Sequence, residues 1–179
     1  EMNQFDKTKD LLVSRQLKST SDSMPFSHYH NAYELYFLLS GERYYFIENR
    51  TYKVNAGDLV LIKPYVIHKT LHAGHREYSH ERILINFTKN SVISFPETGY
   101  ENILTKPFNN VKVLTCSESM RKHIENVMSN IVNEYAGTNL EHIMYIRLQL
   151  TMLLVEISRY ITRNNLVLPV HPSSMHRYI

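Results

Sequence analysis

The sequence predicts a mainly β domain with helices at its C-terminal end, and three observations support this prediction. Short runs of β-branched and aromatic residues, separated by turn residues, follow one another from His28 to Phe87. From Met120 onward, apolar residues recur at spacings of three and four, as on one face of a helix. The 179 residues suit one domain of ordinary size. We therefore expect an antiparallel sandwich or barrel followed by helices.

The composition narrows the class of protein. With 43% hydrophobic and 21% charged residues, the chain can build a core and is not expected to be disordered. The net charge of +3 is spread along the chain, which does not favour nucleic-acid binding by this segment itself. The single cysteine, Cys116, excludes an internal disulfide and fits a reducing compartment. We see no signal peptide or membrane-spanning run and expect a cytoplasmic protein without membrane contact.

The β region contains six candidate strands, each bounded by residues that favour turns. They are His28–Leu39, Arg43–Glu48, Thr51–Val54, Asp58–Lys63, His68–His72 and His80–Phe87. Residues 1–27 precede them as an N-terminal arm with one apolar cluster around Leu11 and Val13. We interpret the arm either as an edge strand on the main body or as a lid over a pocket.

The first candidate strand has apolar residues on both faces. Odd positions carry Leu35 and Phe37, which must be covered by a second sheet or a helix. Even positions place His28, His30 and Glu34 on the other face, directed into an apolar interior. Burying these groups unpaired would be costly, so they require a metal, a ligand, ordered water or one another.

Two helices are predicted in residues 115–164. Thr115 to Glu118 and Thr138 to Glu141 each form a capping-box pattern, and Gly137 ends the first helix. The short connection predicts an antiparallel two-helix hairpin, with the second helix reaching about Arg163. We interpret residues 88–114 as connecting loop with short strands or turns, and residues 165–179 as a linker.

The second helix has more apolar positions than a single core-facing stripe requires. The surplus could pack on the barrel or on a second subunit, and we predict a homodimer because exposed apolar helical faces are usually interaction surfaces. The residues predicted to mediate dimerisation are Leu140, Ile143, Leu150, Leu154, Ile157 and Ile161.

Two stretches resemble the motifs of the cupin family. The segment similar to the first motif runs from His28 to Gly41 and reads H-Y-H-N-A-Y-E-L-Y-F-L-L-S-G. The segment similar to the second motif runs from Gly57 to His68 and reads G-D-L-V-L-I-K-P-Y-V-I-H. Val66 replaces the second motif's usual glycine, and His72 stands where an asparagine is usual. The resemblance implies that residues 28–114 form a double-stranded β-helix, a jelly-roll-like barrel.

A narrower resemblance covers roughly residues 24–164. Three segments, followed by two helices and a linker, resemble the N-terminal effector-binding and dimerisation domain of AraC-family transcriptional regulators. They are Y-E-L-Y-F-L-L-S-G, V-N-A-G-D-L-V-L-I-K-P-Y-V-I-H and R-I-L-I-N-F. The resemblance implies a bacterial regulator whose barrel binds a small effector, often a sugar. The helices would pair two subunits, and a helix-turn-helix domain expected after Ile179 would bind DNA in the parent protein.

His28, His30, Glu34 and His68 match the three-histidine, one-glutamate ligand set of metal cupins. Imidazole and carboxylate together suit divalent Fe, Mn, Ni, Cu or Zn. The resemblance to regulators implies instead that these groups form hydrogen bonds or pack without a cofactor.

Among further effector-binding candidates, Tyr36 shares the inward parity, whereas Arg82 and Asn86 have equal parity on the strand from His80 and could face inward or outward. Tyr36 could stack on a sugar or fill the core, and Arg82 and Asn86 could bind hydroxyls or a carboxylate.

Three functions follow from these patterns. We favour a ligand-sensing regulator domain without catalytic residues, in which effector binding changes how the linker presents the DNA-binding domain. The alternative is a metal-dependent cupin enzyme, such as a dioxygenase or isomerase, although the sequence offers no obvious general base. A third possibility, a structural dimerisation module, would be favoured if Tyr36 and Leu38 filled the barrel interior.

Overall fold

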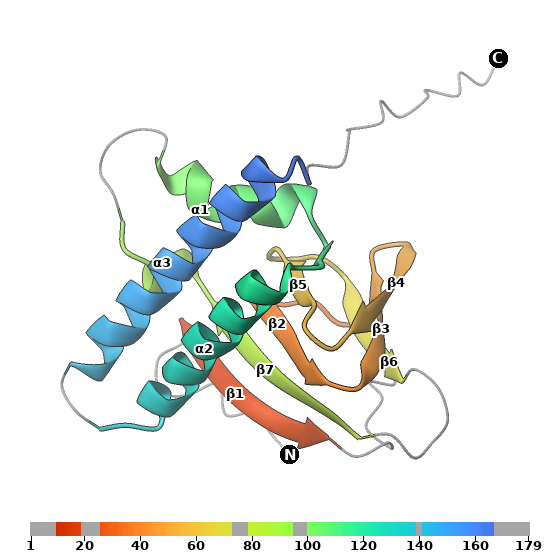
Figure 1. The fold of residues 1–179 in the computed structure, drawn as a ribbon, viewed down its shortest axis with the longest axis horizontal. Coiled ribbons are helices and arrows are strands. Elements are labelled where there is room, and N and C mark those ends of the chain that lie inside the picture. Colours follow the sequence, from red (N-terminus) through yellow and green to blue (C-terminus); the bar gives the residue numbers. More distant parts are fainter. Residues whose placement is uncertain (1–9, 19–25, 73–78, 95–99, 139–140, 167–179) are drawn as a thin grey trace.

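Figure 1 shows the fold in the computed structural model, which describes residues 10–18, 26–72, 79–94, 100–138 and 141–166. Two antiparallel sheets lie beside a layer of helices. The larger sheet has the order β1 (Leu11–Lys18), β7 (His80–Phe87), β2 (Tyr33–Ser40), β5 (Leu59–Ile62) and β8 (Val113–Leu114). The smaller sheet has the order β4 (Arg50–Asn55), β3 (Glu42–Ile47) and β6 (His68–His72). The helical segments are η1 (Lys89–Ser91), α1 (Tyr100–Asn110), α2 (Glu118–Tyr135) and α3 (His142–Arg163).

Strand β2 separates two apolar cores. Its side chains Leu35 and Phe37 belong to an outer core between the larger sheet and the helices. Tyr36 and Leu38 point the other way, into an inner core shared with β3, β4 and β5. All four side chains are fully buried, so neither face of β2 meets solvent between Glu34 and Leu38. The predicted mainly β fold with C-terminal helices is confirmed.

The first described strand lies at the edge of the larger sheet. All eight residues of β1 pair antiparallel with β7, from Leu11 opposite Phe87 to Lys18 opposite His80. The hydroxyl of Tyr135 on α2 donates to the Leu11 carbonyl at 3.2 Å and ties this strand to the helices. Residues 11–18 are therefore an edge strand, whereas residues 1–9 and 19–25 of the predicted arm lie outside the described residues.

Helix α1 was not predicted from the sequence. It occupies part of the 88–114 segment that we interpreted as connecting loop, and its buried Leu104 and Phe108 join the outer core. Pro107 lies inside the helix and has no amide proton to donate to the preceding turn. Proline normally indicates a helix boundary, so the sequence pattern around Pro107 did not predict a helix. The helical layer consequently contains three helices among the described residues.

The starts of the other two helices differ in detail from the prediction. Helix α2 is capped by Ser117, whose Oγ accepts from the Met120 amide at 3.4 Å, two residues later than the predicted cap. Helix α3 begins with Glu141 in the cap position but without a side-chain capping hydrogen bond. The Ser117 amide also donates to the Tyr160 hydroxyl at 2.8 Å, which joins the start of α2 to the last turns of α3.

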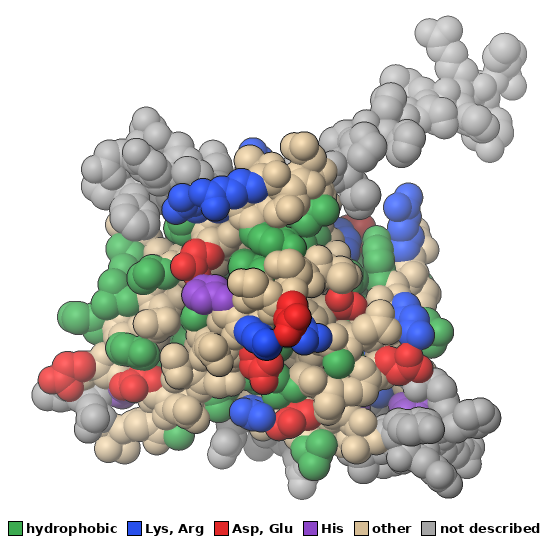
Figure 2. Space-filling model, viewed as in Figure 1, with side chains coloured by type: hydrophobic (Ala, Val, Ile, Leu, Met, Phe, Trp, Pro, Cys, Tyr) green, Lys and Arg blue, Asp and Glu red, His purple; other side chains and the backbone are tan. Residues whose placement is uncertain are grey.

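The predicted dimer residues require a correction. Leu150, Leu154, Ile157 and Ile161 are buried in the outer core of their own chain, so they cannot also form an exposed subunit contact. Ile143 is half-buried, and Leu140 lies outside the described residues. The exposed apolar side chains of α3 are instead Met144, Tyr145, Leu148 and Met152, which we call the α3 stripe. Figure 2 shows hydrophobic side chains gathered at the left of the molecule, over the first half of α3.

Within the described residues, no helix is long and apolar enough to cross a membrane.

Replacement of Leu154 by Ala tests the corrected packing of α3. Leu154 is fully buried, so removing its methyl groups leaves a cavity and should lower the free energy of unfolding by about 2–5 kcal/mol. The matched control Arg159→Ala, at an exposed position on the same helix, should change it by less than about 0.5 kcal/mol. Urea unfolding of both variants measures the difference, and equal stabilities would contradict the buried position of Leu154.

Candidate functional site

Three histidines and one glutamate meet at one end of the barrel. His28 and His30 precede β2, Glu34 is its second residue, and His68 begins β6. The His28 amide donates to the His68 carbonyl at 3.0 Å, and the His68 amide donates to the His28 carbonyl at 2.9 Å. This backbone pairing brings the side chains together, so that ring nitrogens of all three histidines lie within 4.8 Å of one another.

Backbone carbonyls orient two of the three imidazole rings. Nδ1 of His30 lies 3.0 Å from the Ala32 oxygen, and Nδ1 of His68 lies 2.8 Å from the Val66 oxygen. A carbonyl only accepts, so in both rings Nδ1 carries a proton and donates. The Nε2 atoms of the two histidines are therefore the atoms that face the centre of the cluster.

Glu34 is the buried acceptor of this cluster and is only 4% exposed. Its Oε1 accepts a hydrogen bond from the Tyr45 hydroxyl at 2.8 Å. Its Oε2 lies 3.2 Å from Nε2 of His30 and 3.7 Å from Nε2 of His68. Both nitrogens of His30 thus lie within hydrogen-bond distance of oxygen acceptors.

The buried charges shift one another's pKa values. Burial alone would raise the pKa of Glu34, but hydrogen bonding and the charges of His30 and His68 hold it well below its usual range. Burial would lower the pKa of His68, but the Glu34 carboxylate outweighs it and raises this pKa above its ordinary value. Burial and the neighbouring His68 lower the pKa of His28. The cluster therefore favours a charged Glu34 beside a charged His68.

The same donors fit a divalent transition metal. With Nδ1 protonated against a carbonyl, the neutral rings of His30 and His68 would present Nε2 lone pairs to the centre. Metal-binding histidines usually donate their other ring N–H to an acceptor in this way. His28 supplies the third nitrogen, and Glu34 contacts two of the three rings. The four residues would hold the ion, which would supply Lewis-acid or redox chemistry.

The remaining predicted site residues line the interior beyond this cluster. In the sheet register Glu34 lies opposite Asn86, and Leu38 lies opposite Arg82. The Arg82 guanidinium lies over the Tyr36 ring, 5.3 Å from its centroid, and its Nη2 donates to the Gln16 side chain at 3.2 Å. Burial raises the pKa of the Tyr36 hydroxyl to about 12. Tyr36, Arg82 and Asn86 therefore lie on the same inner face of the larger sheet as Glu34.

Two interior residues were missed from the sequence. The Tyr45 hydroxyl donates a hydrogen bond to Glu34. The Arg43 side chain is buried and is 1% exposed. Both lie on β3, whose alternate residues 43, 45 and 47 are buried. The same parity rule that identified the inward face of β2 would have found them if it had been applied to this strand.

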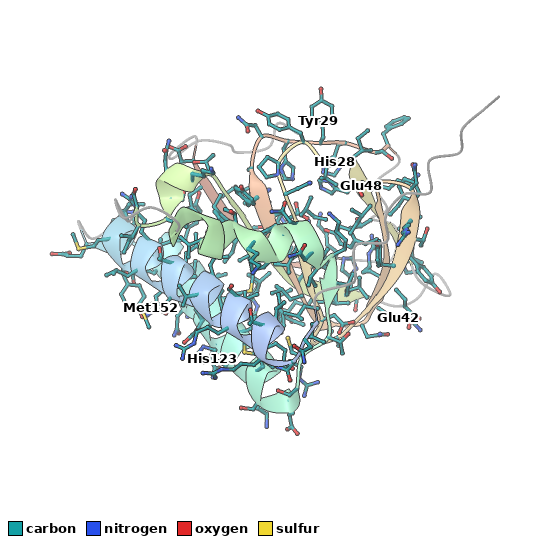
Figure 3. The ribbon with its side chains drawn as sticks, turned by 90° about the horizontal axis from the view of Figure 1, so that it is seen from above. His28, Tyr29, Glu42, Glu48, His123 and Met152 are labelled. Carbon is teal, nitrogen blue, oxygen red and sulfur yellow. The ribbon has the colours of Figure 1, made fainter. Side chains whose placement is uncertain are left out.

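Exposed apolar side chains surround the histidine end of the barrel. They come from the two segments whose backbones pair there, and they are Phe26, Tyr29, Tyr65 and Ile67. Figure 3 shows Tyr29 and His28 together at one edge of the molecule, with Met152 on the other side. The cluster thus lies beneath an apolar rim.

The comparisons with known proteins can now be placed on this geometry. Residues 16–84 match a family model described as the AraC-like ligand binding domain. The match covers 69 of the 179 residues, all of them within the part of the chain that holds β2 to β7 and the end of β1. The resemblance to AraC-family regulators drawn from the sequence is confirmed, and the matched range contains Glu34, His68 and the inner face of both sheets.

Solved structures with the same fold include ToxT from Vibrio cholerae. A structure of ToxT bound to (E)-4-(8-methylnaphthalen-1-yl)but-3-enoic acid has a TM-score of 0.56 and 14% identity, and the match covers 88% of this chain and 58% of ToxT. A second ToxT structure has a TM-score of 0.52 and 13% identity, with coverage of 93% and 61%. The chain thus spans less than two thirds of ToxT.

A cupin protein from Bacteroides fragilis is 23% identical, with a TM-score of 0.42 and coverage of 50% of this chain and 75% of that protein. No curated protein sequence matches this chain.

Replacement of Glu34 by Gln should destabilise the domain in a pH-dependent way. The pKa of Glu34 is lowered from 4.5, so its contribution is present above pH 4.5 and is lost as the pH falls further. The pKa of His68 is raised from 6.5, so its contribution is present below pH 6.5 and is lost as the pH rises through the folded-state value. The loss in free energy of unfolding should therefore be largest between these pH values, at about 2–3 kcal/mol.

Urea unfolding at several pH values, with a chelator present, measures this loss. Glu42→Gln is the matched control, because it breaks the half-exposed pair between Glu42 and Lys53 and should cost much less. A loss for Glu34→Gln that does not vary with pH would argue against the charged cluster.

Proposed function

We propose that this chain is the ligand-sensing domain of a bacterial AraC-type transcription regulator, with a small effector bound inside the barrel. The observation that carries the proposal is a set of enclosed polar atoms. Among the described residues, Tyr36 Oη, Arg82 Nε and Asn86 Oδ1 are buried without a hydrogen-bond partner. An unsatisfied buried polar group costs about 1–3 kcal/mol, so these atoms support a polar occupant.

The chemistry of these atoms favours a hydroxylated effector such as a sugar. The Arg82 Nε group donates, the Asn86 oxygen accepts, and the Tyr36 hydroxyl does both. A hydroxyl group also donates and accepts, so one small polyhydroxylated molecule could satisfy all three. Tyr36 and Leu38 fill part of the inner core, which is the condition we set for a purely structural module. The unpartnered atoms beside them favour the sensor instead.

The comparisons support small-molecule binding and a regulatory role. ToxT is an AraC-family regulator with the same fold, and one of its structures contains an organic acid. In our proposal the domain is not an enzyme and works in the cytoplasm. A helix-turn-helix domain of the parent protein, following the linker at residues 165–179, contacts DNA. Effector binding shifts the domain between two populations that present this partner domain differently.

Titration calorimetry against a panel of sugars and small metabolites tests the effector site. At least one compound should bind the wild-type chain, and Arg82→Gln should weaken its binding at least tenfold, because the charged donor beside Tyr36 is lost. Arg15→Gln is the control, since Arg15 lies on the neighbouring strand but pairs with Glu81 at the surface. A panel without a single ligand, or equal binding by both variants, would count against the barrel site.

We also propose that two copies of the chain pair through the α3 stripe. Met144 and Met152 are 67% and 58% exposed, and Leu148 lies between them at helical spacing. Such a contiguous apolar face on a helix is costly in water and is characteristic of a subunit contact. The predicted homodimer is thus retained, with different residues at its interface.

Sedimentation velocity of the double variant Leu148→Asp, Met152→Asp tests this pairing. Two carboxylates in the apolar stripe should weaken self-association at least a hundredfold, because each would have to be buried without a partner. Leu17→Asp is the matched control, since Leu17 is a leucine on β1, outside α3, that is 70% exposed against 45% for Leu148. A double variant that sediments as the wild type would exclude the stripe as the interface.

The second candidate function is a metal-dependent enzyme of dioxygenase or isomerase type. It is favoured by the grouping of His28, His30 and His68, with Glu34 against two of the rings. Within the described residues the site offers no further group in an evident general-base position. We therefore favour the regulator function over the enzyme function.

Elemental analysis of protein purified without chelator or immobilised metal distinguishes the two candidates. If the cluster holds a metal, the wild type should contain about one equivalent, and the double variant His28→Ala, His68→Ala should lose it. His123→Ala is the control, because His123 is an exposed histidine on α2 that pairs with Glu156. For the metal-free sensor we expect less than about one tenth of an equivalent in all three proteins.

A further inference from the structure

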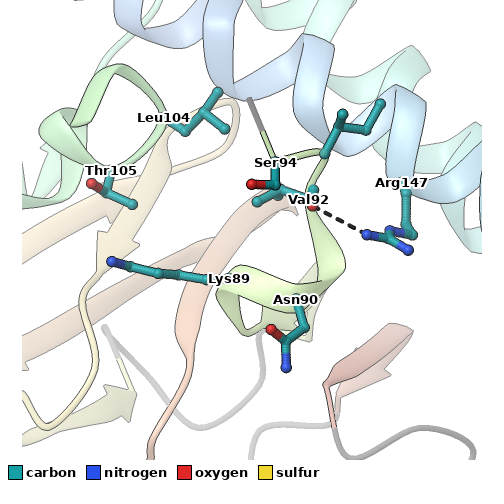
Figure 4. Close-up of a pocket in the computed structure, with 8 residues that line it drawn as sticks. Lys89, Asn90, Val92, Ser94, Leu104, Thr105 and Arg147 are labelled. Atoms are coloured by element: carbon teal, nitrogen blue, oxygen red, sulfur yellow. Dashed lines mark hydrogen bonds between the residues drawn. The ribbon is translucent and has the colours of Figure 1, made fainter. Parts of the chain in front are cut away.

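A second cavity lies outside the barrel, on the helical side of the molecule. Its volume is about 340 Å³, and its walls come from η1 and the residues after it, from α1 and from α3 (Figure 4). Small-molecule pockets in proteins usually measure about 300–1,000 Å³, so this cavity is large enough for a small ligand. It shares no lining residue with the barrel site proposed above.

The wall formed by residues 88–94 is fixed at both ends. At one end the Asp10 carboxylate accepts hydrogen bonds from the Thr88 hydroxyl at 2.6 Å and the Asn90 side chain at 3.3 Å. At the other end the Thr151 hydroxyl of α3 accepts from the Ile93 amide at 3.0 Å and donates to the Arg147 carbonyl at 2.6 Å. These contacts hold the cavity open in a defined shape.

Two cations line the cavity from different walls. Figure 4 shows Arg147 reaching the Val92 carbonyl from α3, while Lys89 lies nearer Thr105 on α1. The Arg147 Nη2 donates to this carbonyl at 3.3 Å, and its Nε is buried without a partner among the described residues. Neither Arg147 nor Lys89 forms an ion pair with a described carboxylate. Among the described residues, no carboxylate therefore compensates these two positive charges.

The rest of the lining is half polar, from Asn90, Ser94 and Thr105, and half apolar. Val92, Ile93 and Leu104 face the cavity together with the two cations. An apolar surface of this kind favours a ligand with a hydrocarbon body, and a guanidinium favours a carboxylate that it can bind through two parallel hydrogen bonds. A free inorganic anion would leave the apolar wall without a partner.

We propose that this cavity binds a small carboxylate with an apolar body, and that Arg147 and Lys89 hold the carboxylate. The ligand would lie against Leu104 and Val92, and its charge would satisfy the buried nitrogen of Arg147. This site is independent of the effector site inside the barrel.

Calorimetry on the whole chain with 4-phenylbutyrate tests the proposal, with neutral 4-phenylbutyramide and inorganic phosphate as comparison probes. We expect 4-phenylbutyrate to bind, and the amide and phosphate to bind at least tenfold more weakly. Arg147→Gln should weaken the binding of 4-phenylbutyrate at least tenfold, and Lys89→Gln at least threefold. Lys89 is exposed, so its variant keeps the test valid if Arg147→Gln does not fold.

Two control variants locate the binding. Arg159→Gln removes an exposed arginine of α3 that does not line the cavity, and Arg82→Gln alters the barrel interior. Both should bind 4-phenylbutyrate as the wild type does, whatever the outcome for the barrel effector. The proposal is overturned if 4-phenylbutyrate does not bind, if the amide or phosphate binds equally well, or if the variants Arg147→Gln and Lys89→Gln bind unchanged.

Discussion

The burial of β2 on both faces is the constraint on which the rest of the structure depends. Leu35 and Phe37 require a layer over the outer face of the sheet, and the helices provide it. Tyr36 and Leu38 require a second sheet over the inner face, and β3 and β4 provide it. A strand without a solvent face also leaves no exposed position for a polar side chain, so every inward polar group of β2 has to find a partner inside the barrel.

Glu34 shows how this constraint produces a site. The carboxylate is enclosed at the end of β2, and the residues that satisfy it come from β3, from the segment before β2 and from β6. The cluster therefore connects both sheets and the chain that enters the barrel. Its components suit either a charged hydrogen-bonded network or a metal ion, and the choice between them separates a sensor from an enzyme.

Local patterns in the sequence were sufficient for β3 to β7 and for the cluster, whereas β2 begins at Tyr33 and not at His28, and β1 and β8 were not fixed. Alternation along β2 identified the inward face, and Gly41 and Gly57, with φ angles of 83° and 92°, mark turns that glycine adopts easily. Helical periodicity was insufficient for the dimer residues, because it finds apolar faces but does not show that Leu154 packs on its own sheet. Parity along β3 marks Tyr45 as inward, but its hydrogen bond to Glu34 and the Arg147 cavity depend on contacts between distant segments, which a single-sequence pattern does not encode.

Methyl NMR of the domain tests most directly whether the effector binds inside the barrel. Val54, Val60 and Ile62 report on the inner core, and Ile85 and Ile157 report on the outer core on the other side of the larger sheet. On addition of the tightest ligand from the sugar and metabolite panel, we predict large shifts of the inner methyl signals and small shifts of the outer ones. Shifts confined to the outer methyl groups, with the inner signals unchanged, would contradict a sensor whose effector lies between the two sheets.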